Sequence, residues 1–258
     1  MNELPRNGLK RALQAGRTQI GLWNSLASAT VVEVIAGAGF DWVLIDMEHA
    51  PNDLPLVHAQ LQALAGHPNV TPVVRPPWND AVMFKRLLDL GVQSFLVPYV
   101  QNASEAAAAV RATRYPPEGT RGFASASRAT GYGRIPDYWQ QAAQEICVLL
   151  QVETTAALGE IEAIAAVDGV DGIFIGPGDL SASMGHLGQP GHPEVRAAID
   201  NALLRIQAAG RPAGFLTGDE ALASHVIQRG AQFVAVGADL VLLARAADAL
   251  RGRFKPDA

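Results

Sequence analysis

Short runs of apolar and β-branched residues recur along the chain and are separated by stretches rich in alanine and leucine. The apolar runs begin at Thr18, Asp41, Thr71, Ser94, Ile146, Val170, Pro212 and Gln232. Most are followed by a segment of helical periodicity, such as residues 103–113 and 194–209. This alternation predicts parallel strands, because each helix carries the chain back to the start of the next strand.

The number of repeats distinguishes two kinds of α/β fold. About eight βα units in a chain of 258 residues match a (β/α)₈ barrel. A doubly wound sheet usually has fewer strands and loses its regularity at a switch point. No linker or shift of composition marks a second domain. We therefore predict an α/β TIM barrel formed by one domain, residues 1–258.

Local signals at helix ends agree with this division of the chain. Asn102 with Glu105 is a capping-box variant, in which each side chain satisfies backbone donors of the first turn. Gly39, Gly91 and Gly230 follow helical segments directly before strands, where glycine commonly ends a helix.

Two segments fit the repeat less well. Residues 115–136 are rich in Pro, Gly and small side chains, and a loop of this length in a compact domain usually serves function or an interface. Residues 240–254 form a strongly apolar helical pattern. This helix is either the last helix of the barrel or a segment that docks on another subunit.

Composition limits the class of partner. The net charge is −5 and the basic residues form no runs, so nucleic acid and anionic membranes are not expected partners. The N-terminal residues contain no apolar signal segment, and no stretch reaches the roughly 20 apolar residues that span a bilayer. Cys147, the single cysteine, lies in an apolar run and fits a reducing compartment. We expect a cytoplasmic protein that acts on small molecules.

Polar residues gather where the predicted strands end. They are Asp46, Glu48 and His49 after the second run, Arg75 after the third, Gln151 and Glu153 after the fifth, and Gly176, Gly178 and Asp179 after the sixth. The active site of a barrel forms at the carboxyl ends of its strands. Acids in such positions also cap helices about as often as they serve chemistry. Here an arginine and a histidine follow other strands of the same predicted barrel, which favours a chemical role for Glu153 and Asp179 over helix capping.

The pair Glu153 and Asp179 predicts a divalent cation, because two nearby carboxylates are costly to bury without one. Oxygen ligands favour Mg²⁺, Mn²⁺ or Co²⁺. Arg75 offers a fixed fork for an oxyanion, and His49 can act as a base. These groups suit enolate chemistry beside a carbonyl.

The lysines argue against imine chemistry. Lys10, Lys85 and Lys255 are the complete set, and none follows a strand. A Schiff base needs a lysine in the active site, so the cation must accept the electrons instead.

Two weaker motifs are set aside. Gly37 and Gly39 resemble part of a dinucleotide fingerprint, but they follow a helix and precede a strand, the reverse of the required order. His186 and His192 lie six residues apart in a Gly-rich loop, which is not a recognised ligand spacing, so we interpret them as solvated loop histidines.

Five segments together resemble a known family. They are DMEHAPND, VVRP, YPPEGTRG, LLQVE and FIGPGDLSASMG, in this order. They are similar to the HpcH/HpaI family of class II, metal-dependent pyruvate aldolases, and the resemblance runs from about Gly8 to Phe254. It implies a modified TIM barrel that assembles as a homo-hexamer, a trimer of dimers, with the C-terminal helix exchanged between partners.

The resemblance also implies roles for individual residues. Glu153 and Asp179 would bind the divalent cation together with pyruvate. Arg75 would stabilise the enolate. His49, oriented or tuned by Asp46, would transfer the proton of the aldol hydroxyl through water. 

The donor side of the site would include Gln151 as a substrate contact and the backbone amides near Gly176 and Gly178 as partners of the pyruvate carboxylate. The family motif commonly has alanine where this chain has Gly178, so the pyruvate site should be slightly wider and donor preference is open. The aldehyde side would be built from Trp23, Leu216 and the loop Arg121–Ser127, which a neighbouring subunit could supply.

The function implied is reversible cleavage of a 4-hydroxy-2-oxo acid to pyruvate and an aldehyde, with 4-hydroxy-2-oxoheptanedioate or a 2-keto-3-deoxy sugar acid as the type of substrate. Two alternatives stay open. A malyl- or citramalyl-thioester lyase shares the barrel and the metal, although no basic cluster for the CoA phosphates is present. A catalytically silent barrel acting as a binding protein is the other.

Overall fold

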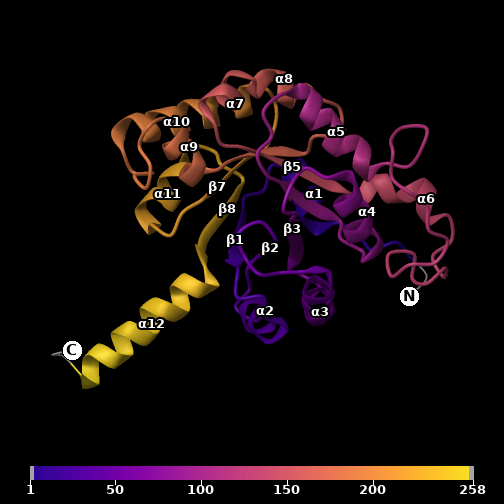
Figure 1. Ribbon diagram of the computed structural model, residues 1–258, viewed down its shortest axis with the longest axis horizontal. Helices are drawn as coiled ribbons and strands as arrows, with labels where there is room; N and C mark the ends of the chain where they lie inside the picture. The colour runs from indigo at the N-terminus through magenta and orange to yellow at the C-terminus, as the bar shows by residue number, and fades with distance from the viewer. Residues whose placement is uncertain (1–2, 256–258) are drawn as a thin grey trace.

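The computed structural model describes residues 3–255, which form a closed barrel in which each strand pairs in parallel with the next and β8 pairs with β1 (Figure 1). The strands are β1 (Gln19–Asn24), β2 (Trp42–Asp46), β3 (Thr71–Arg75), β4 (Ser94–Val97), β5 (Cys147–Val152), β6 (Gly172–Ile175), β7 (Ala213–Leu216) and β8 (Phe233–Ala238). All eight predicted runs contain a strand, and the predicted (β/α)₈ barrel is confirmed.

Helices surround the strands and connect them. They are α1 (Gly8–Gln14), α2 (Ala29–Ala36), α3 (Leu54–Leu64), α4 (Ala81–Asp89), α5 (Ala103–Thr113), α6 (Tyr138–Gln141), the 3₁₀ helix η1 (Ala142–Glu145), α7 (Thr155–Gly159), α8 (Ile161–Ala165), α9 (Pro177–Ser183), α10 (Pro193–Ala208), α11 (Glu220–Gln228) and α12 (Asp239–Phe254).

Side chains of each strand alternate between the inside and the outside of the barrel, as the pleat requires. In β2, Trp42 and Leu44 belong to the interior cluster, whereas Val43 and Ile45 pack beneath the helices. Both faces are apolar, so every residue of β2 is buried. Parity therefore predicts which strand-end residues point inward, and Asp46 follows Leu44 on the inner face.

The amino end of the barrel is closed. Leu9 and Leu13 of α1 join the interior cluster. Large rings fill the space above them, and small residues make room: a Cβ on Gly214 would lie 2.2 Å from the ring of Phe233. The barrel is thus packed through its interior and opens only at the carboxyl ends of its strands.

The predicted helix ends are confirmed. The Glu105 amide donates to Asn102 Oδ1 at 3.0 Å, and Asn102 Nδ2 donates to Glu105 Oε1 at 3.1 Å. Gly39, Gly91 and Gly230 have φ angles of 88°, 90° and 93°, the left-handed region in which glycine has no steric penalty.

Residues 115–136 lie at the amino ends of the strands. Arg128 donates to the carbonyl of Leu90, and the Ala129 amide donates to the carbonyl of Asp89, both at the end of α4 and before β4. Arg121 is buried with its guanidinium 4.4 Å from the ring centre of Tyr115. The loop is therefore packed against its own chain at the end of the barrel opposite the carboxyl ends of the strands.

The last helix, α12, leaves the barrel as an arm (Figure 1). Asp239 fastens its start, because its carboxylate accepts from the amides of Ser25 and Leu26. Beyond this residue the described helix is not buried. The alternative in which this segment packs as the last helix of its own barrel is wrong. No helix among residues 3–255 is long and apolar enough to cross a membrane, and a cytoplasmic location stays a prediction.

Candidate active site

The mouth of the barrel collects the polar strand-end residues predicted from the sequence. Asp46, Arg75 and Gln151 each follow an interior residue two positions earlier, Leu44, Val73 and Leu149. Asp46 and Arg75 are register partners on β2 and β3. Burial of these side chains follows from parity, and each requires a polar partner: Asp46 pairs with Arg75, and Gln151 donates to Glu153.

Asp46 and Arg75 form a bidentate ion pair. Arg75 Nε lies 2.9 Å from Asp46 Oδ1, and Nη2 lies 2.6 Å from Oδ2. Trp23 Nε1 also donates to Asp46 Oδ2 at 3.2 Å. Although burial acts to raise it, the pKa of Asp46 is lowered by the hydrogen bonds and charge of Arg75. The fork predicted for a substrate anion is thus used inside the protein, and Arg75 presents Nη1 to the mouth.

Glu48 is a third carboxylate of the mouth. It lies among the strand-end residues named from the sequence, but no role was predicted for it. Its Oε2 lies 2.9 Å from Arg75 Nη1, yet this buried oxygen accepts no hydrogen bond among the described residues. Burial raises the pKa of Glu48, and the charges of Asp46 and Asp179 raise it further. Glu48 is therefore an ionisable group that faces the same space as Asp179.

His49 lies at the outer edge of the mouth, with 64% of its side chain exposed. Its ring Nε2 is 3.8 Å from Glu48 Oε2. Asp46 meets the backbone amide of His49 at 3.3 Å, and no contact between Asp46 and the imidazole is recorded in the described residues. Asp46 thus orients the backbone that carries His49, while Glu48 is the acid beside the ring.

Glu153 is buried at the end of β5 and is held by two donors. The amide of Tyr99 donates to Oε1 at 2.8 Å, and Gln151 Nε2 donates to Oε2. Tyr99 has a φ of 56°, a conformation that costs energy for a residue with a Cβ and that aims its amide at the carboxylate. Burial raises the pKa of Glu153 to about 7, despite both hydrogen bonds.

Asp179 comes from the first turn of α9 and is exposed. Its charge acts on both Glu153 and Glu48. The helix is not capped by Asp179, because Gly176 holds the N-cap position. A Cβ on Gly176 would lie 2.2 Å from Glu153 Oε2, whereas a Cβ on Gly178 would meet nothing within 4 Å. Glycine is needed at 176 for close packing, and 178 borders open space.

The model of a known family matches residues 19–246, and its description is HpcH/HpaI aldolase/citrate lyase. The chain belongs to this family. Membership confirms the resemblance seen in the five sequence motifs. It also confirms the predicted kind of enzyme, an aldolase that cleaves carbon–carbon bonds.

Individual members are similar over nearly their whole length. A pyruvate aldolase of Rhizobium etli is 58% identical over 252 residues, which cover 98% of this chain and 99% of that protein. A 4-hydroxy-2-oxo-heptane-1,7-dioate aldolase of Klebsiella pneumoniae is 58% identical, with 98% and 95% covered. The crystal structure of a family protein from Burkholderia cenocepacia J2315 superposes with a TM-score of 0.93 at 41% identity, covering 96% and 99%.

HpcH/HpaI aldolases are generally dependent on a divalent metal, and the mouth of this member has the properties that such an ion requires. Glu48, Glu153 and Asp179 lie close enough to influence one another's charge. Gln151 Oε1 is a buried oxygen without a hydrogen-bond donor in the described residues, and Glu48 Oε2 makes no hydrogen bond there beyond its ion pair with Arg75. Unsatisfied oxygens and mutually repelling carboxylates are relieved by a hard cation. The residues therefore fit the ion, with Glu153 and Asp179 as its predicted ligands.

The predicted aldehyde side is only partly brought together in this HpcH/HpaI chain. Trp23 is buried beneath Arg75, whose Cζ lies 5.1 Å from the ring centre. Leu216 ends β7 and packs partly exposed on the interior cluster. The loop Arg121–Ser127 lies at the opposite end of the barrel, since Arg121 contacts Tyr138 there. The same chain cannot place this loop in its own mouth, so only another subunit could supply it.

A buried chain of amides supports the loop after β2. Asn52 Nδ2 donates to the carbonyl of Asp46 at 2.6 Å, and Gln60 Nε2 donates to Asn52 Oδ1 at 2.6 Å. Asn24, at the end of β1, donates to Gln60 Oε1. These residues link β1, α3 and Asp46 below the mouth. Sequence reasoning missed them, because three separate amides carry no spacing that marks a network.

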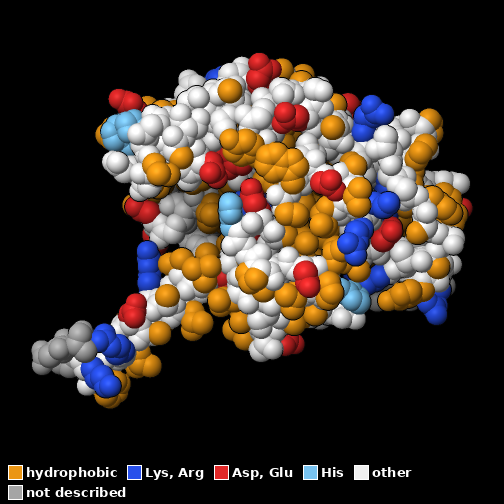
Figure 2. Space-filling model, viewed as in Figure 1, with side chains coloured by type: hydrophobic (Ala, Val, Ile, Leu, Met, Phe, Trp, Pro, Cys, Tyr) orange, Lys and Arg blue, Asp and Glu red, His pale blue; other side chains and the backbone are white. Residues whose placement is uncertain are grey.

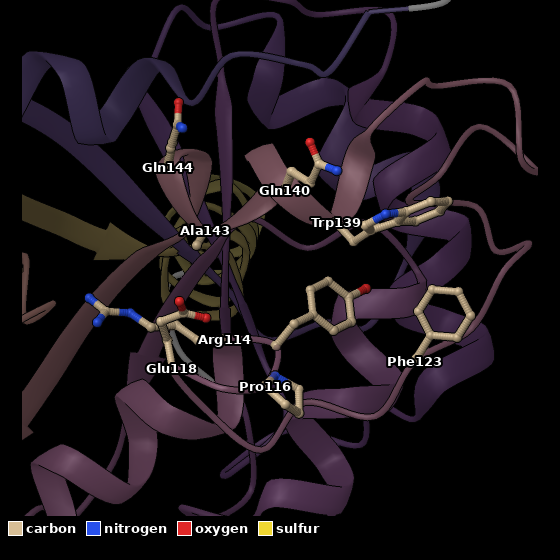
Figure 3. Close-up of a pocket in the computed structure, with 9 residues that line it drawn as sticks. Arg114, Pro116, Glu118, Phe123, Trp139, Gln140, Ala143 and Gln144 are labelled. Carbon is tan, nitrogen blue, oxygen red and sulfur yellow. The ribbon is translucent and has the colours of Figure 1, made fainter.

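A separate cavity of about 760 Å³ lies at the amino end of the barrel (Figure 3). Figure 3 shows Phe123 and Trp139 on one side of it and Arg114 and Glu118 on the other. The rings of Phe123 and Trp139 lie edge to face with their centroids 5.4 Å apart. The cavity is lined by none of the acids of the mouth, so its size does not mark it as the place of the chemistry.

Proposed function

We propose that this chain catalyses the reversible cleavage of a 4-hydroxy-2-oxo acid to pyruvate and an aldehyde with the help of a divalent cation. The observation that carries the proposal is the convergence of Glu48, Glu153 and Asp179 beside Arg75 in one mouth. The relatives named 4-hydroxy-2-oxo-heptane-1,7-dioate aldolase make 4-hydroxy-2-oxoheptanedioate the first substrate to test. Pyruvate aldolase, the name of another relative, supports pyruvate as the shared product.

The cation would be held by Glu153 and Asp179, and when bound it supplies a Lewis acid that withdraws electrons from the 2-keto group. Oxygen ligands favour Mg²⁺, Mn²⁺ or Co²⁺. Gln151 Nε2 keeps the Glu153 carboxylate in place. The backbone near Gly176 and Gly178, which borders open space at Gly178, is the proposed partner of the substrate carboxylate.

Arg75 stabilises the negative charge that grows on the keto oxygen during cleavage. Asp46 holds two of the three guanidinium nitrogens, so the position of Nη1 is fixed before substrate arrives. A donor fixed in advance costs no reorganisation when charge develops. Arg75 is therefore proposed as the enolate-stabilising residue, and Asp46 as the residue that positions it.

His49 removes the proton of the 4-hydroxyl group. As the hydroxyl oxygen becomes the aldehyde carbonyl, the electron pair of the C3–C4 bond moves to C3 and the 2-keto oxygen, giving the enolate of pyruvate. A proton then returns to C3 and completes pyruvate. The exposed position of His49 at the rim fits a group that exchanges protons with water.

Assembly is the remaining part of the proposal. We infer a homo-hexamer in which α12 packs on a second copy of the chain. The exposed side chains of Leu240, Leu243, Leu250 and Phe254 share one side of α12, because their spacings of three, seven and four residues are each close to whole helical turns. Figure 2 shows hydrophobic side chains on the surface of this arm. A helix of this kind gains stability by burying that side.

The experiment measures pyruvate released from 4-hydroxy-2-oxoheptanedioate by metal-stripped enzyme, before and after Mn²⁺ or Mg²⁺ is restored. We expect activity only with the cation. Glu153→Ala should lose both activity and cation binding, whereas His49→Ala should keep the cation and lose about 10²–10⁴-fold in turnover. Glu162→Ala, which removes an exposed partner of Arg205, is the matched control and should behave as the wild type.

Activity that survives complete removal of divalent ions would contradict the proposal. So would a covalent adduct trapped by borohydride and pyruvate, since it requires a lysine in the mouth. Lys10 instead pairs with Asp171 before β6, at the amino end of the barrel. A thioester lyase would be indicated by turnover of malyl-CoA but not of the free acid. A silent barrel would turn over neither.

A further inference from the structure

The loop between α9 and α10 brings two histidines and an acid into contact. The rings of His186 and His192 stack with centroids 3.6 Å apart and planes inclined by 16°. His186 Nε2 lies 3.1 Å from Glu194 Oε2. The sequence interpretation of separate solvated histidines does not describe this arrangement, because the fold of the loop closes their six-residue spacing.

Backbone hydrogen bonds hold the loop in this shape. The His186 amide donates to the carbonyl of Ser181 at 2.7 Å, the Gln189 amide to His186 at 2.9 Å and the His192 amide to Gln189 at 3.0 Å. His192 is the N-cap of α10, where its Nδ1 accepts from the Glu194 amide at 3.3 Å. The rings are thus carried by a defined backbone, His186 in the loop after α9 and His192 at the N-cap of α10.

The donor atoms of the three side chains form a compact group. One ligand atom from each of His186, His192 and Glu194 lies within 4.8 Å of the other two. A cation with bonds of about 2.0–2.2 Å to imidazole nitrogen and carboxylate oxygen fits between His186 Nε2 and Glu194 Oε2, where it replaces the shared proton. The parallel rings require His192 to turn before it becomes the third ligand, and both rings are partly exposed and have room to turn.

The chemistry of this cluster differs from that of the mouth. The pKa of Glu194 is lowered by its hydrogen bond with His186 and by the charges of both histidines, so the carboxylate is ionised at neutral pH. Imidazole nitrogen is a borderline ligand that binds Zn²⁺, Ni²⁺, Co²⁺ and Cu²⁺, whereas Mg²⁺ takes oxygen. In a solution that contains both kinds of ion, Mg²⁺ should therefore prefer the mouth, and the borderline ions can bind to the histidine cluster.

We propose that His186, His192 and Glu194 form a second divalent-metal site, specific for borderline transition-metal ions, that clamps the α9–α10 loop and leaves further coordination positions open. The site is separate from the oxygen ligands Glu153 and Asp179. It does not rest on the proposed aldolase activity.

The test counts Ni²⁺ ions bound per chain by untagged, full-length protein, using calorimetry and metal analysis after dialysis. The variants are His186→Asn and His192→Asn, singly and combined. Asparagine at 192 keeps an N-cap acceptor for α10 and so separates loss of the imidazole from loss of the helix start. We expect the wild type to bind one more Ni²⁺ per chain than the double variant, whose affinity at this site should fall more than about 100-fold.

His225→Asn is the matched control, because His225 forms an exposed pair with Asp200 at 3.0 Å and belongs to no group of three potential ligands among residues 3–255. It should leave the Ni²⁺ count unchanged. Glu153→Ala should lose the other Ni²⁺ and keep this one. In Mg²⁺ titrations the wild type and the histidine variants should be equal.

Equal Ni²⁺ counts in the wild type and the double variant would overturn the proposal. An equal loss in His225→Asn would overturn it as well, since it would indicate general binding to surface histidines. Thermal unfolding provides the second measurement: Ni²⁺ should raise the melting temperature more in Glu153→Ala than in Glu153→Ala with both histidines replaced. Equal shifts would also count against the site.

Discussion

The mouth of the barrel and α12 differ in where their partners lie. In the mouth, Asp46, Arg75 and Glu153 are buried and find hydrogen-bond partners within the same chain. Along α12, Leu243 and Leu250 are 60% and 56% exposed, with no part of the described chain covering them. The comparison shows that one chain contains what is needed to arrange its charged groups, but not what is needed to bury its last helix.

The difference has a physical origin. A buried charge without a partner costs several kcal/mol, so charged groups must be satisfied as the barrel closes. An exposed leucine costs less, because each Å² of apolar surface contributes only about 25 cal/mol. The chain can therefore fold its mouth first and leave the burial of α12 to a later encounter.

The largest expected effect lies in the mouth. Arg75→Ala should lower kcat about 10²–10³-fold with a smaller change in KM, because it removes a donor fixed for the transition state. Arg75→Lys should recover only part of the loss, since lysine cannot hold both oxygens of Asp46. Exchange of pyruvate methyl protons with deuterium isolates the enolate step. If Arg75→Ala exchanged these protons at the wild-type rate, Arg75 would serve binding of the aldehyde or stability of the fold rather than the enolate. Arg205→Ala, which breaks an exposed ion pair, is the control.

Protons should compete with the cation for the mouth. Burial raises the pKa of Glu153 to about 7, so below that pH the metal-free carboxyl holds a proton that the cation must displace. Mn²⁺ affinity should fall about tenfold per pH unit below 7 and level off above it. Glu48, whose pKa is also raised, acts in the same direction. Calorimetry between pH 6 and 8 checks this, and a flat affinity would contradict it.

The same shift predicts how metal-free stability depends on pH. Between the ordinary pKa of 4.5 and about 7, folded Glu153 binds more protons than the unfolded chain does, so the free energy of unfolding falls as pH rises. Saturating Mn²⁺ should flatten or reverse this trend. Urea unfolding at several pH values, with and without Mn²⁺, measures both curves.

The buried amides of Asn24, Asn52 and Gln60 test whether the mouth is positioned by residues of its own chain. Gln60→Leu should lower kcat about tenfold, because Asn52 loses the partner that fixes it on Asp46. It should also cost about 1–3 kcal/mol in stability, since buried amides are left unpaired. Mn²⁺ affinity should be unchanged, a result that separates positioning from general damage. Gln62→Leu, on the exposed side of α3, is the control.

The smallest effect on chemistry is expected from the arm. Leu243→Gln combined with Leu250→Gln should reduce the proposed hexamer to smaller species in light scattering, while Mn²⁺ binding stays within about twofold of the wild type. Asp248→Ser, on a neighbouring part of the same helix, should leave assembly intact. An unchanged hexamer would show that α12 does not hold it together.

Much of the barrel could be predicted from sequence because strand and helix periods repeat eight times. Strand-end positions such as Arg75 and Glu153 follow from parity, which brings alternate residues inward whatever the loops do. The roles of these residues stay predictions. The exposed position of α12 could not be predicted from its hydrophobic pattern. An apolar helix has the same pattern whether it packs on its own barrel or on the barrel of another subunit.

The residues that sequence reasoning missed depend on loop geometry. Tyr99 reaches Glu153 through a backbone amide, so its side chain gives no signal, and its positive φ is rare for tyrosine. Glu48 was visible in the motif, but only the structure places it beside Arg75. His186 and His192 meet because the loop turns back on itself.

The packed interior of the barrel has a kinetic consequence. Because large side chains fill the interior, and Leu9 and Leu13 cover its amino end, the mouth has one opening and no passage through the barrel. Pyruvate is proposed to lie against Glu153 at the bottom of this opening, and the aldehyde nearer the rim. The aldehyde must then leave before pyruvate can, and in the synthetic direction pyruvate must enter before the aldehyde. With these proposed positions, the single opening predicts an ordered sequence of binding and release, in which pyruvate is the product that competes directly with the substrate for the empty enzyme.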